Sequence, residues 1–458
     1  MILVRLLSVH DFGRYREFLV YTGLLISIAA FGVNSSLLRF VPDNPQAGWR
    51  YVNQTVAFTF ASSVLIAVGT LALDALSGGA LVGEYALQVA LYVFLFVNLD
   101  FWEMLWLSEK RSYAVLGYST ARLLGRLVVV TVAAALTKDV DALIWSLIGL
   151  ESVRLAISAV GWRRRGRTAP SGTPARWREH LEYCLPFGGA LVLISLNRSL
   201  GALFVAKMLG PVALAHYTIG IYVTPIITVL RNSVSDVLLP EMVSQKREAS
   251  SDRLALWRRS TIVTAIALVG VGVVLARFAE PLVLILFSEK YLPAAPIFQL
   301  YVLVFLRSSI DFAVPLRAAD RTAPILRSNL YAIAANALML FVLAPSMGVM
   351  GAVVAFLISS AVDGLYLAVQ TMRAYNAPLS ALADWKDVAK LLASAALASL
   401  TLIGSFWTSL GLLGVVLGAT VYFLVFLLLL VWLRVPEAQA ALQLLRTAPM
   451  LVLRRRPQ

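Results

Sequence analysis

Cysteine and histidine are nearly absent from this 458-residue chain, which has one cysteine and three histidines. A disulfide framework needs at least two cysteines, and a cysteine-based zinc site needs more thiolates than Cys184 alone supplies. The histidines, His10, His180 and His216, lie far apart along the chain and form no cluster with the spacing of metal ligands. The sequence therefore predicts no metal site and no cofactor.

Charge is also scarce, because only 14% of the residues are charged while 60% are hydrophobic. Soluble domains are on average about 25% charged and about 45–50% apolar. So few charged residues cannot cover the surface of a soluble protein of this length, which excludes a soluble nucleic-acid-binding protein and a disordered chain. With a mean hydropathy of +0.81, we expect a polytopic membrane protein.

Apolar stretches of the roughly 20 residues that a membrane-spanning helix needs recur along the whole chain. We predict thirteen spans, at 18–39, 53–73, 85–107, 113–136, 142–161, 183–207, 216–240, 260–287, 295–317, 325–344, 348–372, 387–409 and 411–433. The connections between them are too short to hold a soluble catalytic domain.

Positive charge is distributed unevenly between alternate connections. With the basic segment 162–182 placed in the cytoplasm, 26 of the 39 Lys and Arg residues fall on that side, 7 on the opposite side and six inside spans. Cytoplasmic loops carry an excess of Lys and Arg. The distribution predicts a multi-pass membrane protein whose C-terminus, ending RRRPQ, is cytoplasmic.

Two pairs of similar segments indicate an internal repeat. VRLLSVHDFGRY at 4–15 resembles AKMLGPVALAHY at 206–217, and KRSYAVL at 110–116 resembles DRTAPIL at 320–326. A full apolar helix precedes the motif in the second copy, whereas only a few residues precede it in the first. We therefore expect the first helix of the fold to be missing from this sequence. Transporters built from such repeats bind substrate between the halves.

The fold class predicted from these patterns is an all-α integral membrane protein with two parallel six-helix lobes and a C-terminal helix pair, with 13 helices seen of an expected 14. The expected parts are an N-terminal lobe at 1–161, a basic cytoplasmic loop at 162–182, a C-terminal lobe at 183–374, a helix pair at 387–434 and a basic cytoplasmic tail at 435–458.

The segment RLLSVHDFGRYREFLVYTGLLISIAAFGVNSSLLRFVPDN resembles the N-terminal signature of the polysaccharide transporters, the O-antigen-type flippases of the multidrug/oligosaccharidyl-lipid/polysaccharide flippase superfamily. Phe12-Gly13-Arg14-Tyr15 and Arg39-Phe40 occupy the signature positions, and NRSLGALFVAKMLGPVALAHY resembles the seventh helix of the family. Two departures are the absent first helix and Ser8, where the family usually has Gly. The resemblance implies a non-enzymatic carrier that moves undecaprenyl-diphosphate-linked oligosaccharide outward by alternating access, with membrane lipids, a polysaccharide polymerase and glycosyltransferases as further partners and no nucleic acid.

Arginines inside the spans are candidate binding residues, because charge at membrane depth is costly and needs an anion, carbonyls or water. Arg122, Arg126, Arg198 and Arg231 have no acid three or four residues away on their own helix. Guanidinium groups bind phosphate oxygens in bidentate geometry, so we predict that these four bind the diphosphate. The structural alternative is pairing with Asp236 or Asp363 on neighbouring helices.

Asp363 has no other charged residue in its span and is the candidate for ion coupling, with pairing to an arginine as the alternative. Three other functions are open. A multidrug efflux carrier of the same superfamily would favour unpaired acids, and a lipid II flippase would share the diphosphate. A membrane glycosyltransferase or polymerase would need carboxylates or a metal in sizeable outer loops, which this chain lacks.

Overall fold

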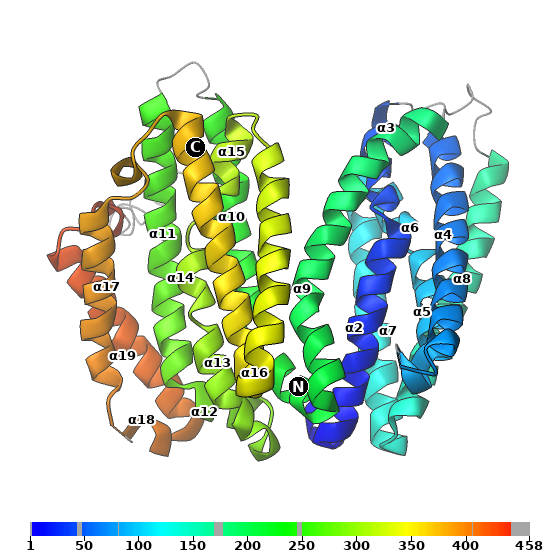
Figure 1. Ribbon diagram of the computed structural model, residues 1–458, viewed down its shortest axis with the longest axis horizontal. Coiled ribbons are helices and arrows are strands. Elements are labelled where there is room, and N and C mark those ends of the chain that lie inside the picture. The colour runs from blue at the N-terminus through cyan, green and yellow to red at the C-terminus, as the bar shows by residue number, and fades with distance from the viewer. Residues whose placement is uncertain are drawn as a thin grey trace, which may run out of the picture. The chain divides into compact units, whose positions relative to one another are not determined.

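The computed structural model describes residues 2–43, 48–80, 82–168, 177–244, 250–404 and 406–440. All regular structure in these ranges is helical. Contacts divide the chain into two compact units, Met1–Ala215 and His216–Gln458, which are described separately below (Figure 1).

The first unit is built mainly from long helices, with a short helix at its N-terminus and a short 3-10 helix between α4 and α5. Its elements are α1 (Ile2–Leu6), α2 (Val9–Ala30), α3 (Val33–Asp43), α4 (Gly48–Leu76), η1 (Gly83–Tyr85), α5 (Ala86–Val97), α6 (Phe101–Ser108), α7 (Ser112–Thr137), α8 (Val140–Thr168) and most of α9 (Trp177–Gly220).

The second unit combines long helices with several short ones. Its elements are α10 (Thr224–Ser244), α11 (Ser250–Arg277), α12 (Ala279–Leu286), η3 (Glu289–Ala294), α13 (Ala295–Tyr301), α14 (Val304–Ser308), α15 (Ala313–Ala318), α16 (Ala323–Tyr375), η4 (Leu379–Ala381), α17 (Trp385–Ser399), η5 (Leu400–Leu402), α18 (Phe406–Ser409) and α19 (Gly411–Trp432).

The surface of α4 is reversed relative to a helix of a soluble protein. Its buried face carries small polar side chains, among them Thr59 and Ser63, whereas Leu65 and Leu76 on the opposite face are 72% and 85% exposed. Small and hydroxyl-bearing residues are typical of helix–helix contacts inside a bilayer, where lipid tails already solvate the apolar side chains. This pattern identifies α4 as a membrane-spanning helix.

Nine helical stretches of the described chain are long and apolar enough to cross a membrane, or ten with the bent pair Glu289–Tyr301 and Val304–Ala318. Two of these stretches, Trp177–Ser244 and Ala323–Tyr375, contain a break, at Gly210 and Gly348 respectively. Their division at the breaks, together with the shorter α17, accounts for the spans that the sequence predicts. The all-α membrane fold is confirmed.

The helices on both sides of the basic segment 162–182 extend into it. The arginine-rich end of the predicted loop 162–182 continues α8 to Thr168, and α9 begins at Trp177. Arginine favours helix, so the helix runs on past the apolar stretch. Residues 169–176 of that loop, and 441–458 of the predicted tail, lie outside the described residues.

The helix predicted to open the second lobe packs within the first unit. A Cβ atom on Gly188 of α9 would lie 2.1 Å from the carbonyl oxygen of Phe31, which shows how closely the two backbones approach. Near the start of α9, His180 contacts Ser36 at 2.6 Å and Gln54 at 3.1 Å. The contacts therefore place the division after Ala215, whereas the sequence predicts that the second lobe begins at 183. The six-helix repeat itself stays a prediction.

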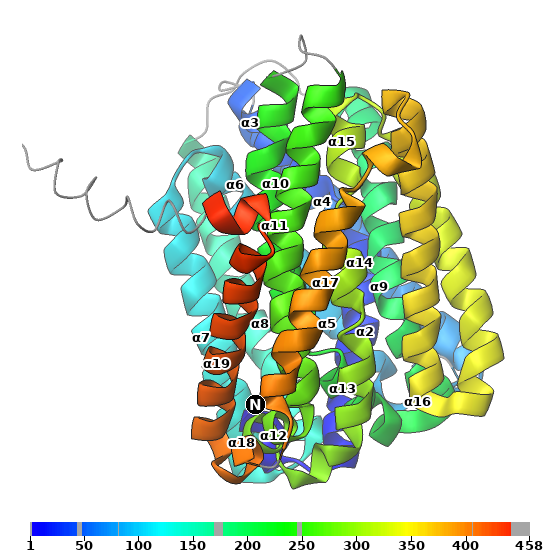
Figure 2. The same cartoon turned by 90° about the vertical axis from the view of Figure 1, so that its left-hand side faces the viewer.

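In the second unit, α17 and α19 pack beside α11 and carry a large apolar cluster (Figure 2). Tyr422 and Phe426 of α19 are fully buried there and stack on each other, with ring centroids 5.6 Å apart. Leu391 of α17 and Phe278, at the end of α11, belong to the same cluster. The C-terminal helix pair is thus an integral part of this unit.

Candidate functional site

A charged cavity of about 370 Å³ lies inside the second unit. It contains three arginines and three aspartates, from α10, from α14 and α15 and the loop between them, and from α16. Its polar and charged lining residues are Arg231, Asn232, Ser235, Asp236, Arg307, Asp311, Arg317, Ser328, Asn329 and Asp363. Two of the residues predicted from the sequence, Arg231 and Asp363, are therefore brought together in one cavity.

Arg307 holds one side of this cavity. It donates hydrogen bonds to the Asp363 carboxylate at 2.6 Å, to the Ser360 carbonyl at 3.0 Å and to the Ile310 carbonyl at 2.9 Å. The Ile310 carbonyl lies just after the end of α14, where a helix break leaves backbone acceptors without helical partners, whereas the Ser360 carbonyl lies within α16. Asp363 pairs with Arg307, which is the alternative that the sequence left open for it.

Arg231 lies near Asp311 but is not hydrogen-bonded to it, since its Nε and the nearest carboxylate oxygen are 3.9 Å apart. Asp311 instead accepts a hydrogen bond from Ser235 at 2.8 Å. The Nε of Arg231 is buried and has no hydrogen-bond partner, although 35% of the side chain is exposed. Arg231 therefore retains donors for another acceptor.

The first unit has a cavity of about 390 Å³ lined in part by Asp100, Glu103 and Arg122. Arg122 of α7 lies 2.9 Å from Glu103 and 3.7 Å from Asp100, both at the start of α6. Ser119 also donates to Glu103 at 2.9 Å. Arg122 thus has an acidic environment that comes from a neighbouring helix, which spacing along its own helix does not reveal.

The other two predicted arginines have different surroundings. Arg126 hydrogen-bonds with Tyr15 and lies beside Tyr92. Arg198 of α9 is exposed, and no acidic partner is found for it among the described residues. Arg122, Arg126 and Arg198 belong to the first unit and Arg231 to the second, so their role as one diphosphate site stays a prediction.

Glu151 and Arg154, which are three residues apart on α8, form an ion pair with each other. Arg154 also donates to the Tyr118 hydroxyl at 2.8 Å. Together with Trp102, Trp106 and other residues, Arg154 and Tyr118 line an apolar groove of about 390 Å³ on α6, α7 and α8.

Broken helices adjoin the charges in both units. In the first, α5 ends at Val97 and α6 starts at Phe101, directly beside Asp100. In the second, α13, α14 and α15 follow one another with short breaks on either side of Arg307. Discontinuous helices place unpaired backbone groups at membrane depth, where transporters bind polar cargo.

The charged cavity of the second unit also contains Arg307, Asp311 and Arg317, which were not among the predicted binding residues. The signal that could have found them is charge inside the spans at 295–317. No group of three or more His, Cys, Asp and Glu side chains suited to a metal ion is found in the part of the chain that the structure describes.

Two solved structures share this fold at low sequence identity. The lipid II flippase MurJ in an inward closed conformation aligns with a TM-score of 0.61 at 14% identity, over 92% of this chain and 95% of that one. An inward-facing multidrug resistance transporter of the MATE family, in the MOP superfamily, aligns with a TM-score of 0.57 at 12% identity, over 82% of this chain and 94% of that one. At such identities the likeness establishes the fold.

No curated protein sequence matches the chain. A sequence model of the family described as polysaccharide biosynthesis protein matches residues 2–296. That match covers more than half of the chain and includes the signature segments 4–15 and 206–217. The chain belongs to this family of polysaccharide biosynthesis proteins.

Proposed function

We propose that this protein is a flippase that moves undecaprenyl-diphosphate-linked oligosaccharide from the inner to the outer leaflet of the bacterial cytoplasmic membrane. The family match to polysaccharide biosynthesis and the transporter fold support this class of carrier. The sugar would be assembled by glycosyltransferases before transport and extended by a polymerase afterwards. The C-terminus would lie in the cytoplasm.

The observation that carries the proposal is the incomplete pairing of two arginines. Arg198 has no acidic partner among the described residues, and Arg231, whose Nε lies 3.9 Å from Asp311, makes no hydrogen bond through that buried Nε. A guanidinium group in an apolar span is costly unless an anion neutralises it. A diphosphate offers that anion and accepts bidentate hydrogen bonds. Arg122 and Arg126 are the further diphosphate-binding candidates.

The pairing of the acidic side chains with arginines argues against a cationic cargo. Glu103, Glu151 and Asp363 each form an ion pair with an arginine within their own unit. A carrier of drug cations would need carboxylates that are free to bind them. Asp236 is an exposed residue of the charged cavity that Arg231 and Arg307 line. It is the acid that would bind a drug cation if the protein were a multidrug efflux carrier.

A coupling ion at Asp363 would compete with Arg307 for the carboxylate, because the two side chains are 2.6 Å apart. Transport by an Asp363→Asn variant across a range of pH tests this role. A rate that depends on pH in the wild-type protein but not in the variant supports it, and identical profiles contradict it.

The proposed cargo is tested by locating the lipid-linked oligosaccharide when the protein is depleted. We expect it to accumulate where a membrane-impermeant sugar label reaches it in inverted vesicles but not in intact spheroplasts. Mass analysis of the accumulated lipid distinguishes a surface oligosaccharide from the peptide-bearing lipid II. Unchanged labelling from outside, combined with greater drug sensitivity, would instead establish the efflux carrier.

Binding residues are tested by complementation of the depleted strain. Arg198→Gln and Arg231→Gln should each lower transport at least about tenfold, because a charge-assisted hydrogen bond contributes about 1.5–3 kcal/mol. Arg373→Gln is the matched control, since Arg373 is exposed at the end of α16 and outside the charged cavities. Full transport by an Arg231→Gln protein that is inserted at the wild-type level would remove Arg231 from the site.

A further inference from the structure

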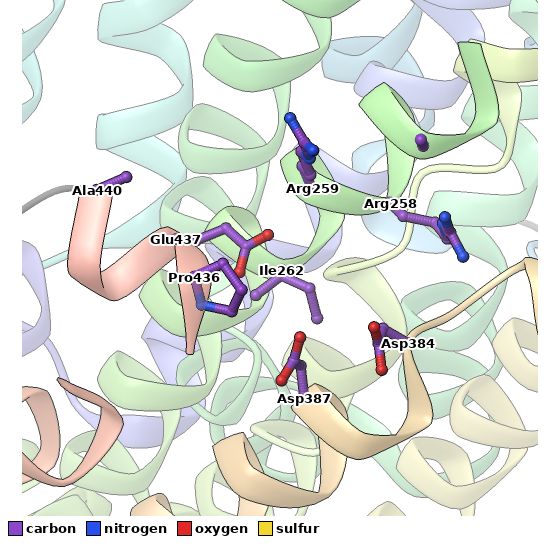
Figure 3. Close-up of a pocket in the computed structure, with 9 residues that line it drawn as sticks. Arg258, Arg259, Ile262, Asp384, Asp387, Pro436, Glu437 and Ala440 are labelled. Carbon is purple, nitrogen blue, oxygen red and sulfur yellow. The ribbon is translucent and has the colours of Figure 1, made fainter. Parts of the chain in front are cut away.

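A second charged cavity, of about 500 Å³, lies elsewhere in the second unit. It is enclosed by α11, by the start of α17 and by the segment that follows α19. Figure 3 shows the carboxylates of Asp384, Asp387 and Glu437 directed toward one space around Ile262, with Arg258 and Arg259 of α11 bordering it. Neither the proposed cargo site nor the ion pairs described above involve these residues.

The cavity lies at the polar ends of three apolar helices, α11, α17 and α19. Arg258 and Arg259 immediately precede the apolar part of α11, and Glu437 follows the end of α19 at Trp432. Trp432 and Trp385, at the start of α17, are 75% and 56% exposed. Exposed tryptophans at the ends of spans mark the membrane interface. The cavity is therefore at the depth of lipid head groups.

The charges around the cavity balance. Lys390 binds Asp387 at 2.7 Å and adds a third cation to the two arginines, which matches the three carboxylates. Asp387 is buried, with 8% of its surface exposed, whereas Asp384 is exposed and has no hydrogen-bonded partner among the described residues. Such an arrangement complements a ligand that carries one positive and one negative group.

Glu437 specifies the kind of positive group. Its Oε2 atom is buried and has no hydrogen-bond partner, and a buried acceptor left unpaired costs about 1–3 kcal/mol. A primary ammonium group has three N–H donors, as in lysine, whereas a trimethylammonium group has none. A ligand that satisfies Glu437 must therefore donate a hydrogen bond.

We propose that this cavity binds the head group of a phosphatidylethanolamine-type phospholipid. Its phosphate lies against Arg258 and Arg259, which supply bidentate donors. Its ammonium group donates to Glu437 and Asp384. The site selects ethanolamine over choline by hydrogen bonding, and over anionic lipids because an anionic head group offers no cation to its carboxylates. It is separate from the proposed cargo site.

The test is native mass spectrometry of the purified full-length chain with phospholipids that share the same acyl chains. We expect phosphatidylethanolamine to bind about tenfold more tightly than phosphatidylcholine, the gain expected from one charge-assisted hydrogen bond, with intermediate affinities for the mono- and dimethylated head groups. Glu437→Gln should reduce this preference severalfold. Arg258→Ala should weaken the binding of both lipids and leave their ratio unchanged.

Glu280→Gln is the matched control, since Glu280 is an exposed carboxylate of α12 that does not line the cavity. Elution profile and melting temperature identify any variant that fails to fold. Equal affinity for the two lipids in the wild type, tighter binding of phosphatidylglycerol, or full preference in Glu437→Gln would overturn the proposal. Binding by a chain that ends at Ala440, but not by the full-length chain, would overturn it too. That result would mean that the residues after Ala440 occupy the cavity instead of a lipid.

Discussion

Arg307 joins two helices through a single side chain, since it donates to one carboxylate and two backbone carbonyls. Only 22% of the side chain is exposed, so water does not replace these bonds when the guanidinium is removed. We expect Arg307→Ala to lower the free energy of unfolding by about 3 kcal/mol, as is typical when a buried ion pair loses one partner. Denaturation of the purified protein in detergent measures this change.

The exposed Arg373 provides the control for that measurement, and Arg373→Ala should change the stability by less than about 0.5 kcal/mol. Because Arg307 and Asp363 share one contact, the double variant Arg307→Ala/Asp363→Ala should lose less than the sum of the single variants. Additive losses would show that the pair contributes no coupling energy.

Glu437 gives the stability of the protein a pH dependence. Burial raises the pKa of its carboxyl group above the ordinary value, and the nearby Asp387 and Asp384 carboxylates raise it further. A hydrogen bond from the backbone N–H of Glu437 itself and the charge of Arg259 oppose this rise in pKa. The protonated form therefore favours the folded state, fully below the ordinary pKa, and this contribution is lost as pH rises through the raised pKa.

The Glu437→Gln variant isolates that dependence, because glutamine resembles the neutral acid at every pH. In detergent without phospholipid, the melting temperature of the wild type relative to the variant should fall as the pH rises above the ordinary carboxyl pKa of about 4.3. A difference that stays constant, or that grows in favour of the wild type, would contradict the raised pKa.

Single residues could be identified from the sequence, but their partners could not. Charge inside an apolar span is visible directly, and it indicated Arg122, Arg231 and Asp363. The acids that surround Arg122 lie on α6, and Asp363 meets Arg307 across two helices. Spacing on one helix reports only neighbours three or four residues away, so for Arg307 it indicates Asp311 and misses the observed partner Asp363.

At the scale of helices, the contact between α9 and α2 depends on the absence of a side chain. A Cβ at Gly188 would lie 2.1 Å from the Phe31 carbonyl oxygen, whereas a Cβ at the adjacent Gly189 would meet nothing within 4 Å. We expect Gly188→Ala to push the two helices apart. Overpacking of this kind lowers the free energy of unfolding by about 1–3 kcal/mol, so the melting temperature should fall by several degrees.

Gly189→Ala is the matched control at the next residue. It should be neutral or stabilising by up to about 1 kcal/mol, because alanine is favoured over glycine inside a helix. Thermal unfolding of both variants compares them directly, and equal melting temperatures would show that α9 does not pack on α2 in this way.

Helix number and type were predictable, because an apolar run of some 20 residues has few alternatives to a membrane-spanning helix. Helix breaks were harder to predict. Positive φ angles, of 44° at Phe31 and 82° at Gly210, occur inside continuous apolar runs. Hydropathy does not report them, and the grouping of 183–215 with the first unit depends on contacts between distant segments.

Across the whole molecule, each of the two units contains a charged cluster of its own. The first unit uses the helices around Asp100 and Arg122, and the second uses those around Arg307 and Asp363. Each cluster satisfies most of its own charges inside its unit. A carrier with this arrangement can keep both units intact while the cargo binds and leaves.

The orientation of the whole chain can be tested by labelling single cysteines. Cys184 is buried, so it gives little background and can be replaced by serine. We expect a cysteine at Lys290 to react with an impermeant maleimide on intact cells, and one at Arg373 to react only after permeabilisation, because cytoplasmic connections carry the excess positive charge. The reverse pattern would invert the predicted topology.

Gly210 has a further consequence. It interrupts α9 with φ of 82° and ψ of 179°, shortly before the division between the units at Ala215. A hinge needs only a few residues that can absorb a large change in dihedral angles, and glycine tolerates such changes without a steric penalty. The torsion of one residue can therefore set the direction in which the chain leaves the first unit. Its substitution would slow turnover while leaving both units folded.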